Sequence, residues 1–176
     1  MKLFQKFKKK PKTEQNVIQT TCFDKVDYHY EKALEAYLTV HRKEVKELSD
    51  DEILEVQRYA GNHIGFFLAW IIQNHHEGEL HVEDTEELEA VRNETMSGID
   101  FLLECCDGKL WKDDMSEEIY PFVNGYYDQY LSDYTQWVLE ELHDVPLEFA
   151  GSWEEYHDFE PVLDKAYADY KKRRNL

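Results

Sequence analysis

The chain has 176 residues, a length typical of one compact domain. Its 20 Lys and Arg residues face 38 Asp and Glu residues, which gives a formal net charge of −18 at pH 7. Proteins that read nucleic-acid phosphates need a basic surface, so this charge argues against nucleic-acid binding. Hydrophobic residues make up 42% of the chain, which supports a folded core, but no apolar run approaches the roughly 18 to 20 residues of a membrane span.

Cations gather at the two ends of the chain. Residues 1–12 contain six lysines and no acidic residue, and residues 171–174 are four consecutive cations. We therefore expect a basic N-terminal tail over 1–21, an acidic helical domain over 22–170 and a basic C-terminal tail over 171–176. The first segment lacks the apolar centre of a secretory signal, and an odd number of cysteines, three, suits a reducing compartment. Together these features predict a cytoplasmic location.

With seven Gly and four Pro, the sequence favours long helices over many short strands. Apolar residues at helical spacing predict a first helix over 31–48. Ser49 and Glu52 match a capping box, in which each side chain bonds a free backbone N–H group at the start of a helix. The segment 22–30 is expected to be extended or turn-like, and it is one of two places, with 145–150, where a short strand fits.

Four more helix starts follow along the chain. Asp84 and Ser97 are predicted to cap two short helices, Ser116 opens a long aromatic helix, and Ser152 caps the last one. Pro161 lies inside that last helix and is expected to kink or restart it. The sequence therefore predicts a mainly α fold, a single compact domain of about five or six helices with at most one or two short strands.

A histidine-rich stretch after the second predicted helix raises the question of a metal site. Zinc needs three or four N, O or S ligands that converge, usually from defined spacings. The stretch has no His-Glu-x-x-His pattern, and its adjacent histidines point to different sides of a helix end. We interpret it as an exposed polar helix terminus and predict no metal and no cofactor. Its candidate ligands are His75, His76, Glu77, Glu79 and His81.

The sequence has no assembled catalytic motif. Cys105 and Cys106 are expected near a helix C-terminus, where the helix dipole disfavours a thiolate, so we interpret them as small core residues. There is no glycine-rich phosphate loop and no Gly-x-Ser-x-Gly motif. With 38 acidic residues, close carboxylate pairs arise by chance and carry no information. We therefore assign no catalytic residue.

Acidic runs and an aromatic ladder are the candidate partner-binding features. The runs span residues 81–89 and 113–118, and the ladder has Tyr and Trp at helical spacing between residues 126 and 137. Solvated helix starts and a core stripe would explain the same patterns. As an interface, aromatic anchors bordered by carboxylates suit a basic protein surface. The candidate partner-binding residues are Asp84, Glu86, Glu87, Glu89, Asp113, Asp114, Glu117, Glu118, Asp128, Tyr130, Asp133 and Trp137.

Several short sequence strings, which follow one another along the chain, together resemble the pattern of a known family. They are Phe23-Asp-Lys-Val-Asp-Tyr-His-Tyr30, Asn62-His-Ile-Gly-Phe-Phe-Leu-Ala-Trp70, Phe101-Leu-Leu-Glu-Cys-Cys-Asp-Gly-Lys-Leu110, Tyr126-Tyr127 with Tyr130-Leu-Ser-Asp-Tyr134, and Ser152-Trp-Glu-Glu-Tyr156 with Pro161-Val-Leu-Asp164. Together they resemble an uncharacterised family of small acidic bacterial proteins, over roughly residues 23–170. The resemblance brings no catalytic residue with it. It implies a bacterial, single-domain protein, and that class is rich in immunity partners of secreted toxins.

The leading hypothesis is a cytoplasmic immunity protein, or antitoxin, that binds and neutralises a cognate secreted toxin. The toxin is expected to be basic, such as a nuclease, and to be blocked at its active cleft or at an exosite. We expect no nucleic-acid partner and no stable membrane insertion, and the oligomeric state is left open. Two alternatives remain: a peripheral membrane adaptor that uses the basic residues 1–12, and a metal-dependent hydrolase that uses the region of His63, His75, His76 and His81.

Overall fold

Residues 21–175, which the computed structural model describes, form six α-helices and one two-stranded sheet. This confirms the predicted mainly α fold in a single compact domain, whereas residues 1–20 of the basic tail expected over 1–21 lie outside the described residues. Within the described part, no helix combines the length and the apolar character needed to cross a bilayer. The elements are β1 (Cys22–Lys25), α1 (Val26–His41), η1 (Val45–Glu47), α2 (Asp50–Gln73), η2 (Glu79–His81), α3 (Thr85–Arg92), α4 (Gly98–Cys105), β2 (Lys109–Trp111), η3 (Lys112–Asp114), α5 (Tyr120–Trp137), η4 (Val138–Leu142) and α6 (Trp153–Arg174).

Strands β1 and β2 pair antiparallel, with Asp24 opposite Leu110. The first strand lies inside the segment 22–30, as the sequence allowed. The second does not lie at 145–150. It follows α4 instead, because Gly108 adopts a positive φ of 69° and turns the chain back beside β1. The Val26 N–H donates to the Gly108 carbonyl and extends the pairing by one bond.

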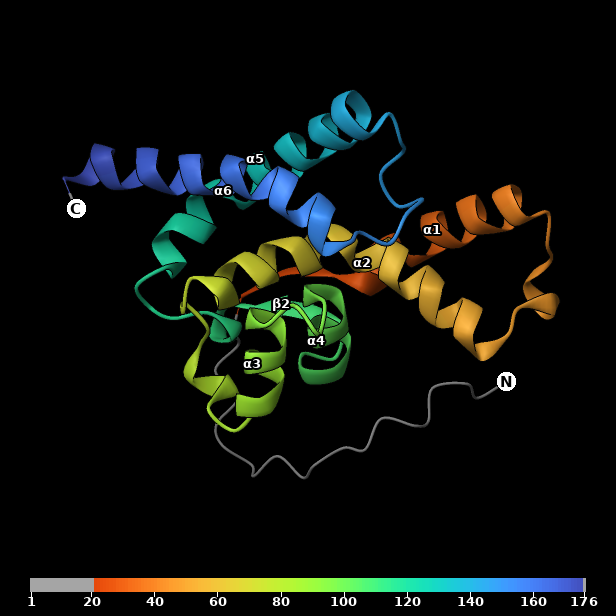
Figure 1. Ribbon diagram of the computed structural model, residues 1–176, viewed down its shortest axis with the longest axis horizontal. Coiled ribbons are helices and arrows are strands. Elements are labelled where there is room, and N and C mark those ends of the chain that lie inside the picture. Colours follow the sequence, from red (N-terminus) through yellow and green to blue (C-terminus); the bar gives the residue numbers. More distant parts are fainter. Residues whose placement is uncertain (1–20, 176) are drawn as a thin grey trace.

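Helix α2 runs through the centre of the fold and contacts α1, α3, α4 and α6 (Figure 1). Its predicted capping box is confirmed: Ser49 Oγ accepts from the Glu52 N–H, and the Glu52 carboxylate accepts from the Ser49 N–H. Every residue from Ala60 to Ile72 is buried. This stretch is therefore covered on all sides, because other helices pack around it.

Glycines let α2 and α4 approach each other closely. Ser97 caps α4, as predicted, and Gly98 begins the helix against Gly65 of α2. A Cβ atom at Gly98 would lie 2.1 Å from the Gly65 carbonyl oxygen, and one at Gly65 would lie 2.5 Å from the Ile99 nitrogen. Both distances are far shorter than van der Waals contact. The two helices therefore pack backbone against backbone, and only hydrogen fits between them.

Aromatic side chains fill the space between α2, α5 and α6. Phe67 packs on Tyr130 with 4.6 Å between ring centroids, and the Tyr130 hydroxyl donates to the His63 carbonyl. The Trp70 indole N–H donates to Asp164 of α6 over 2.9 Å. Both polar groups thus have an acceptor, which is the condition for burying Tyr and Trp at low cost. The aromatic ladder of α5 is part of this layer and belongs to the core.

Helix α1 differs from the predicted helix over 31–48. It begins at Val26, directly after β1, and ends at His41. Arg42 adopts a left-handed conformation with φ of 52°, and its N–H donates to the Leu38 carbonyl, which closes the helix. The periodic apolar residues after this point lie in η1 and the turn that follows it.

Two predicted N-caps have other partners. The Asp84 carboxylate bonds the His81 ring instead of capping α3. The Ser116 N–H donates to the His76 carbonyl, and α5 begins later, at Tyr120. At Asp84 the bond to His81 replaces the local cap that the sequence pattern indicates, whereas the Ser116 hydroxyl caps no helix and has no hydrogen-bond partner among the described residues.

Helix α6 is continuous from Trp153 to Arg174, so it does not restart at Pro161, one of the two outcomes expected there. Pro161 and His157, whose carbonyl the proline cannot bond, are both exposed, so water can solvate that carbonyl. Ser152 caps the helix as predicted. The cations at 171–174, expected in a tail, form the last helical turn, where they face the negative end of the helix dipole.

The contact between α2 and α4 predicts a sharp difference between two glycines. We expect Gly65→Ala to destabilise the fold by about 2–3 kcal/mol, because the added methyl group forces the helix backbones apart. Gly125 of α5 has open space around its Cβ position, so Gly125→Ala should stabilise by about 0.5–1 kcal/mol through helix propensity. Urea unfolding of both variants measures these changes. Equal effects at the two positions would contradict the packing described here.

Candidate functional site

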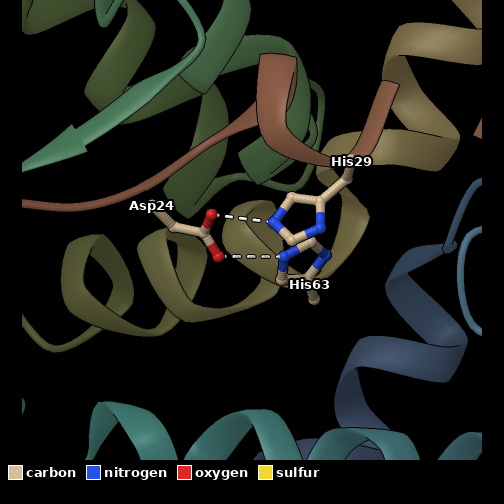
Figure 2. A group of neighbouring side chains, drawn as sticks. All are labelled: Asp24, His29 and His63. Atoms are coloured by element: carbon tan, nitrogen blue, oxygen red, sulfur yellow. Dashed lines mark hydrogen bonds and ion pairs between the residues drawn. The ribbon is translucent and has the colours of Figure 1, made fainter. Parts of the chain in front are cut away.

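Asp24, His29 and His63 form a polar cluster inside the fold (Figure 2). Asp24 Oδ1 lies 2.8 Å from His29 Nε2, and Asp24 Oδ2 lies 3.2 Å from His63 Nε2. Figure 2 shows both imidazoles turned toward the carboxylate, and their rings meet nearly at right angles with 4.5 Å between centroids. Asp24 and His63 are buried, whereas the His29 side chain keeps 27% of its surface exposed. The cluster therefore reaches from the core to the surface.

Three elements supply the cluster. Pairing with β2 places Asp24 near the end of β1. Because α1 begins immediately at Val26, His29 lies one turn further along and folds back over the carboxylate. His63 comes from the buried middle of α2, against which α1 packs. The cluster thus forms only when the strand, α1 and α2 have assembled.

Two further donors complete the hydrogen bonding of the carboxylate. The Lys25 backbone N–H donates to Asp24 Oδ1 over 2.7 Å, and the Tyr127 hydroxyl of α5 donates to Oδ2 over 3.3 Å. With the two imidazoles, each oxygen therefore has two donors. A buried carboxylate needs such bonds to replace the water that it loses.

Burial and hydrogen bonding act in opposite directions on this cluster. Burial on its own would raise the pKa of Asp24, but hydrogen bonds from His29 and His63 outweigh it and hold the pKa well below its usual range. Burial lowers the pKa of His63, and the bond to Asp24 does not reverse the shift. At pH 7 Asp24 is therefore ionised and His63 is neutral. Their contact is a hydrogen bond in which His63 donates.

The same three side chains are metal-ligand types. Their donor atoms all lie within 4.8 Å of one another. Two imidazoles and one carboxylate are a ligand set that Zn²⁺ and Fe²⁺ use. An ionised carboxylate beside a neutral imidazole is also how an acid orients a catalytic base. The cluster is thus chemically competent in two ways, and both depend on the exposed edge of His29.

A second buried cluster lies between η2 and η3. His81 Nδ1 is 2.9 Å from Asp84 Oδ2, and His81 Nε2 is 3.2 Å from Asp114 Oδ1. Cys106 Sγ lies 3.9 Å from the same Nε2 atom. Burial on its own would lower the pKa of His81, but the hydrogen bonds with Asp114 and Asp84 outweigh it and raise the pKa. The two carboxylates therefore favour the protonated form of His81.

The structure separates the histidines of the hydrolase alternative. His63 lies with Asp24, His81 lies between Asp84 and Asp114, and His75 is exposed at the end of α2. These three histidines therefore do not converge on one site in the described part of the chain. The membrane-adaptor alternative depends on residues 1–12, which lie outside it.

The two adjacent cysteines lie at the C-terminal end of a helix, as predicted. Cys105 ends α4, and Cys106 follows it as a buried residue. Burial raises the pKa of the Cys106 thiol well above its ordinary value, and the neighbouring Asp114 charge acts in the same direction. This environment opposes a thiolate, so Cys106 is not an activated nucleophile.

The predicted partner-binding residues fall into two groups. Asp114, Tyr130 and Trp137 are buried in the core and cannot meet a partner, so they are removed from the binding set. Asp114 bonds His81, while the other two pack in the aromatic layer. The remaining candidates are exposed or partly exposed: Asp84, Glu86, Glu87, Glu89, Asp113, Glu117, Glu118, Asp128 and Asp133.

The fold joins the two acidic runs. The Gly78 N–H donates to the Asp114 carbonyl, and His81 bridges the runs through Asp84 and Asp114. A hollow lies at this junction, and the exposed apolar residues of η2 and the turn after it lie beside it. We call this surface the acidic face and define it by Glu79, Leu80, Val82, Glu83, Asp113 and Glu117.

Comparison with known proteins places the chain in a family. Residues 22–148 match the family described as a domain of unknown function, DUF7832. The chain belongs to this family. The resemblance to an uncharacterised family is confirmed at that level, and the DUF7832 region contains both buried clusters and the acidic face. No curated protein and no solved structure matches the chain.

The sequence analysis named His63 but missed Asp24 and His29. All three residues of this DUF7832 cluster lie in two of the strings that carry the resemblance, 23–30 and 62–70. The sequence signal that could have identified them is the pair itself: an acidic residue, Asp24, followed five residues later by a histidine, His29. Their convergence with His63 was not visible, because 39 residues separate it from Asp24.

Replacing Asp24 tests the carboxylate. We expect Asp24→Asn to destabilise the DUF7832 domain by about 3 kcal/mol, because the amide presents an NH2 group where donors already point. Asp27→Asn removes the same charge at an exposed position of α1 and should change stability by less than about 0.5 kcal/mol. Urea denaturation of both variants measures the difference. A loss at position 24 no larger than at position 27 would disprove this role.

The second cluster predicts a pH dependence. The folded pKa of His81 is raised above its ordinary value of 6.5, so its contribution to stability is fully present below about pH 6.5 and is lost as the pH rises through the folded pKa. We therefore expect His81→Gln to cost more unfolding free energy at pH 6 than at pH 9. His41→Gln, at an exposed histidine, is the control. A cost for His81→Gln that is independent of pH would show that this imidazole carries no charge in the fold.

Proposed function

We propose that this DUF7832 protein is an immunity protein, which binds and neutralises a basic secreted toxin in the cytoplasm. The distribution of charge carries the proposal. Of the carboxylates in residues 21–175, only Asp24 and Asp114 are buried. The others keep contact with solvent, so the excess negative charge faces other molecules. Such a surface attracts cationic proteins and raises their association rates.

The acidic face supports a specific contact rather than diffuse attraction. Its apolar residues Leu80 and Val82 are 49% and 76% exposed. Glu79 and Glu83 flank them in the chain, and Asp113 and Glu117 come from the second run. Apolar anchors surrounded by a charged rim are the usual anatomy of a protein interface. The matching partner surface has an apolar pocket bordered by Lys and Arg.

The proposed inhibition needs no chemistry in this chain. An interface of standard size buries roughly 1,600 Å² in total, so the acidic face is its centre rather than its whole extent. Lys112 is the one cation lining the hollow, and it pairs with Glu117 over 2.9 Å, which leaves the net charge there negative. A toxin held in this way is neutralised when its active cleft, or an exosite beside it, is covered.

Co-expression with the product of the adjacent gene tests the proposal. We expect that product to arrest growth alone, and to be harmless and recovered in complex when this chain is present. Raising the salt concentration from about 50 to 500 mM should weaken the purified complex, because salt screens the charges that steer it. A neighbouring product that is harmless, or that forms no complex, counts against the proposal.

Paired variants locate the interface. Glu79→Lys combined with Leu80→Ala should weaken the complex at least about tenfold and abolish growth rescue, because it reverses a rim charge and removes an anchor. Glu140→Lys combined with Leu139→Ala makes the same changes in η4, where Leu139 is 51% exposed, and should leave both unchanged. Isothermal titration calorimetry measures the affinities. Equal loss in the two double variants would place the interface elsewhere.

A further inference from the structure

We propose that Asp24, His29 and His63 bind a divalent transition-metal ion, with Zn²⁺ as the best-matched candidate. This inference is independent of toxin binding, because the cluster and the acidic face are different parts of the fold. Two neutral nitrogens and one carboxylate match the borderline character of zinc, whereas Ca²⁺ and Mg²⁺ prefer oxygen ligands alone.

The donor atoms are close to the spacing that a bound ion requires. Two ligands held at about 2.0–2.1 Å from a tetrahedral ion lie roughly 3.3 Å from each other. The distance from Asp24 Oδ2 to His63 Nε2 is 3.2 Å, which needs no movement. The distance from Asp24 Oδ1 to His29 Nε2 is 2.8 Å, so this pair must open by about half an ångström. His29 is the exposed member, and its side chain has room to make that movement.

The protons can be accounted for without an external base. In the hydrogen-bonded cluster a neutral His63 carries its proton on Nε2 and donates it to Asp24. When Nε2 binds the ion, that proton is carried on Nδ1 instead, so the imidazole stays neutral and the carboxylate stays ionised.

The surroundings of the carboxylate fit a metal ligand. The Lys25 N–H and the Tyr127 hydroxyl hold Asp24 from outside the triangle of donor atoms, as supporting hydrogen bonds do in metal sites. They would keep the carboxylate in position while the imidazoles exchange hydrogen bonds for metal bonds. The acidic surface concentrates cations around the chain, and His29 opens the cluster to them. Three protein ligands would leave a zinc ion at least one position for water.

The second buried cluster, His81 with Cys106 and Asp114, is a weaker metal site. Its imidazole already bonds two carboxylates, one through each ring nitrogen, so an ion would have to break one of these bonds. Its thiol is buried and protonated. At the first cluster each imidazole bonds only the one carboxylate that would join it on the ion, and no thiol is involved.

Titration of the full chain with Zn²⁺ and Co²⁺ tests the inference, after treatment with a chelator and its removal. We expect one equivalent of each ion to bind, and the Co²⁺ absorption spectrum to show nitrogen and oxygen ligands. His29→Gln should weaken binding at least about tenfold, because one of three ligands is lost. His157→Gln is the matched control, since His157 is an exposed histidine that also lies beside carboxylates. It should bind as the native chain does.

Three results would overturn the assignment. They are the absence of stoichiometric binding to the native chain, equal affinity in His29→Gln, and a thiolate-to-cobalt charge-transfer band, which would place the ion at one of the three cysteines, Cys22, Cys105 or Cys106. Circular dichroism of His29→Gln separates loss of a ligand from loss of the fold. The native titration and the cobalt spectrum decide the question even if that variant unfolds.

Discussion

Burial of the Asp24 carboxylate is the constraint on which the architecture depends. An ion is tolerated inside a protein only where donors replace its water, and here the donors come from four elements. Lys25 belongs to β1, His29 to α1, His63 to α2 and Tyr127 to α5. A shift of any one element would leave the charge short of a donor. The network therefore sets how the N-terminal strand and α1 sit on the central helix.

Another part of α2 is also fixed by close contacts, but there the contact is glycine packing rather than hydrogen bonding. Gly65 and Gly98 bring α4 into backbone contact, and the chain after α4 returns as β2 to pair with the strand that carries Asp24. Beyond it, His81 lies between Asp84 and Asp114 and joins η2 to η3. The buried His81 side chain therefore bridges two acidic runs that are distant in sequence. The acidic face thus depends on the buried hydrogen bonds that His81 makes with Asp84 and Asp114.

The two proposals depend on different carboxylates: one on those at the surface, the other on a buried one. Nearly all described carboxylates face solvent, where they favour a cationic protein partner. The one paired with two imidazoles through separate oxygens is buried, where a partner cannot reach it but a small ion can. The region that matches the DUF7832 family contains both features, and the family description favours neither proposal. The surface and the cluster share no residue, so separate variants can test them.

Composition and local pattern alone determined the helical class, the capping residues Ser49, Ser97 and Ser152, and the acidic character, because these depend on neighbouring residues in the chain. They could not determine which polar residues turn inward. Asp84 resembles a cap and Pro161 a helix break, yet the first bonds His81 and the second is accommodated on an exposed helix face. Asp24, His29 and His63 meet only through packing of α1 on α2. Tertiary structure decided the cluster and the acidic face, because both join residues that the chain keeps far apart.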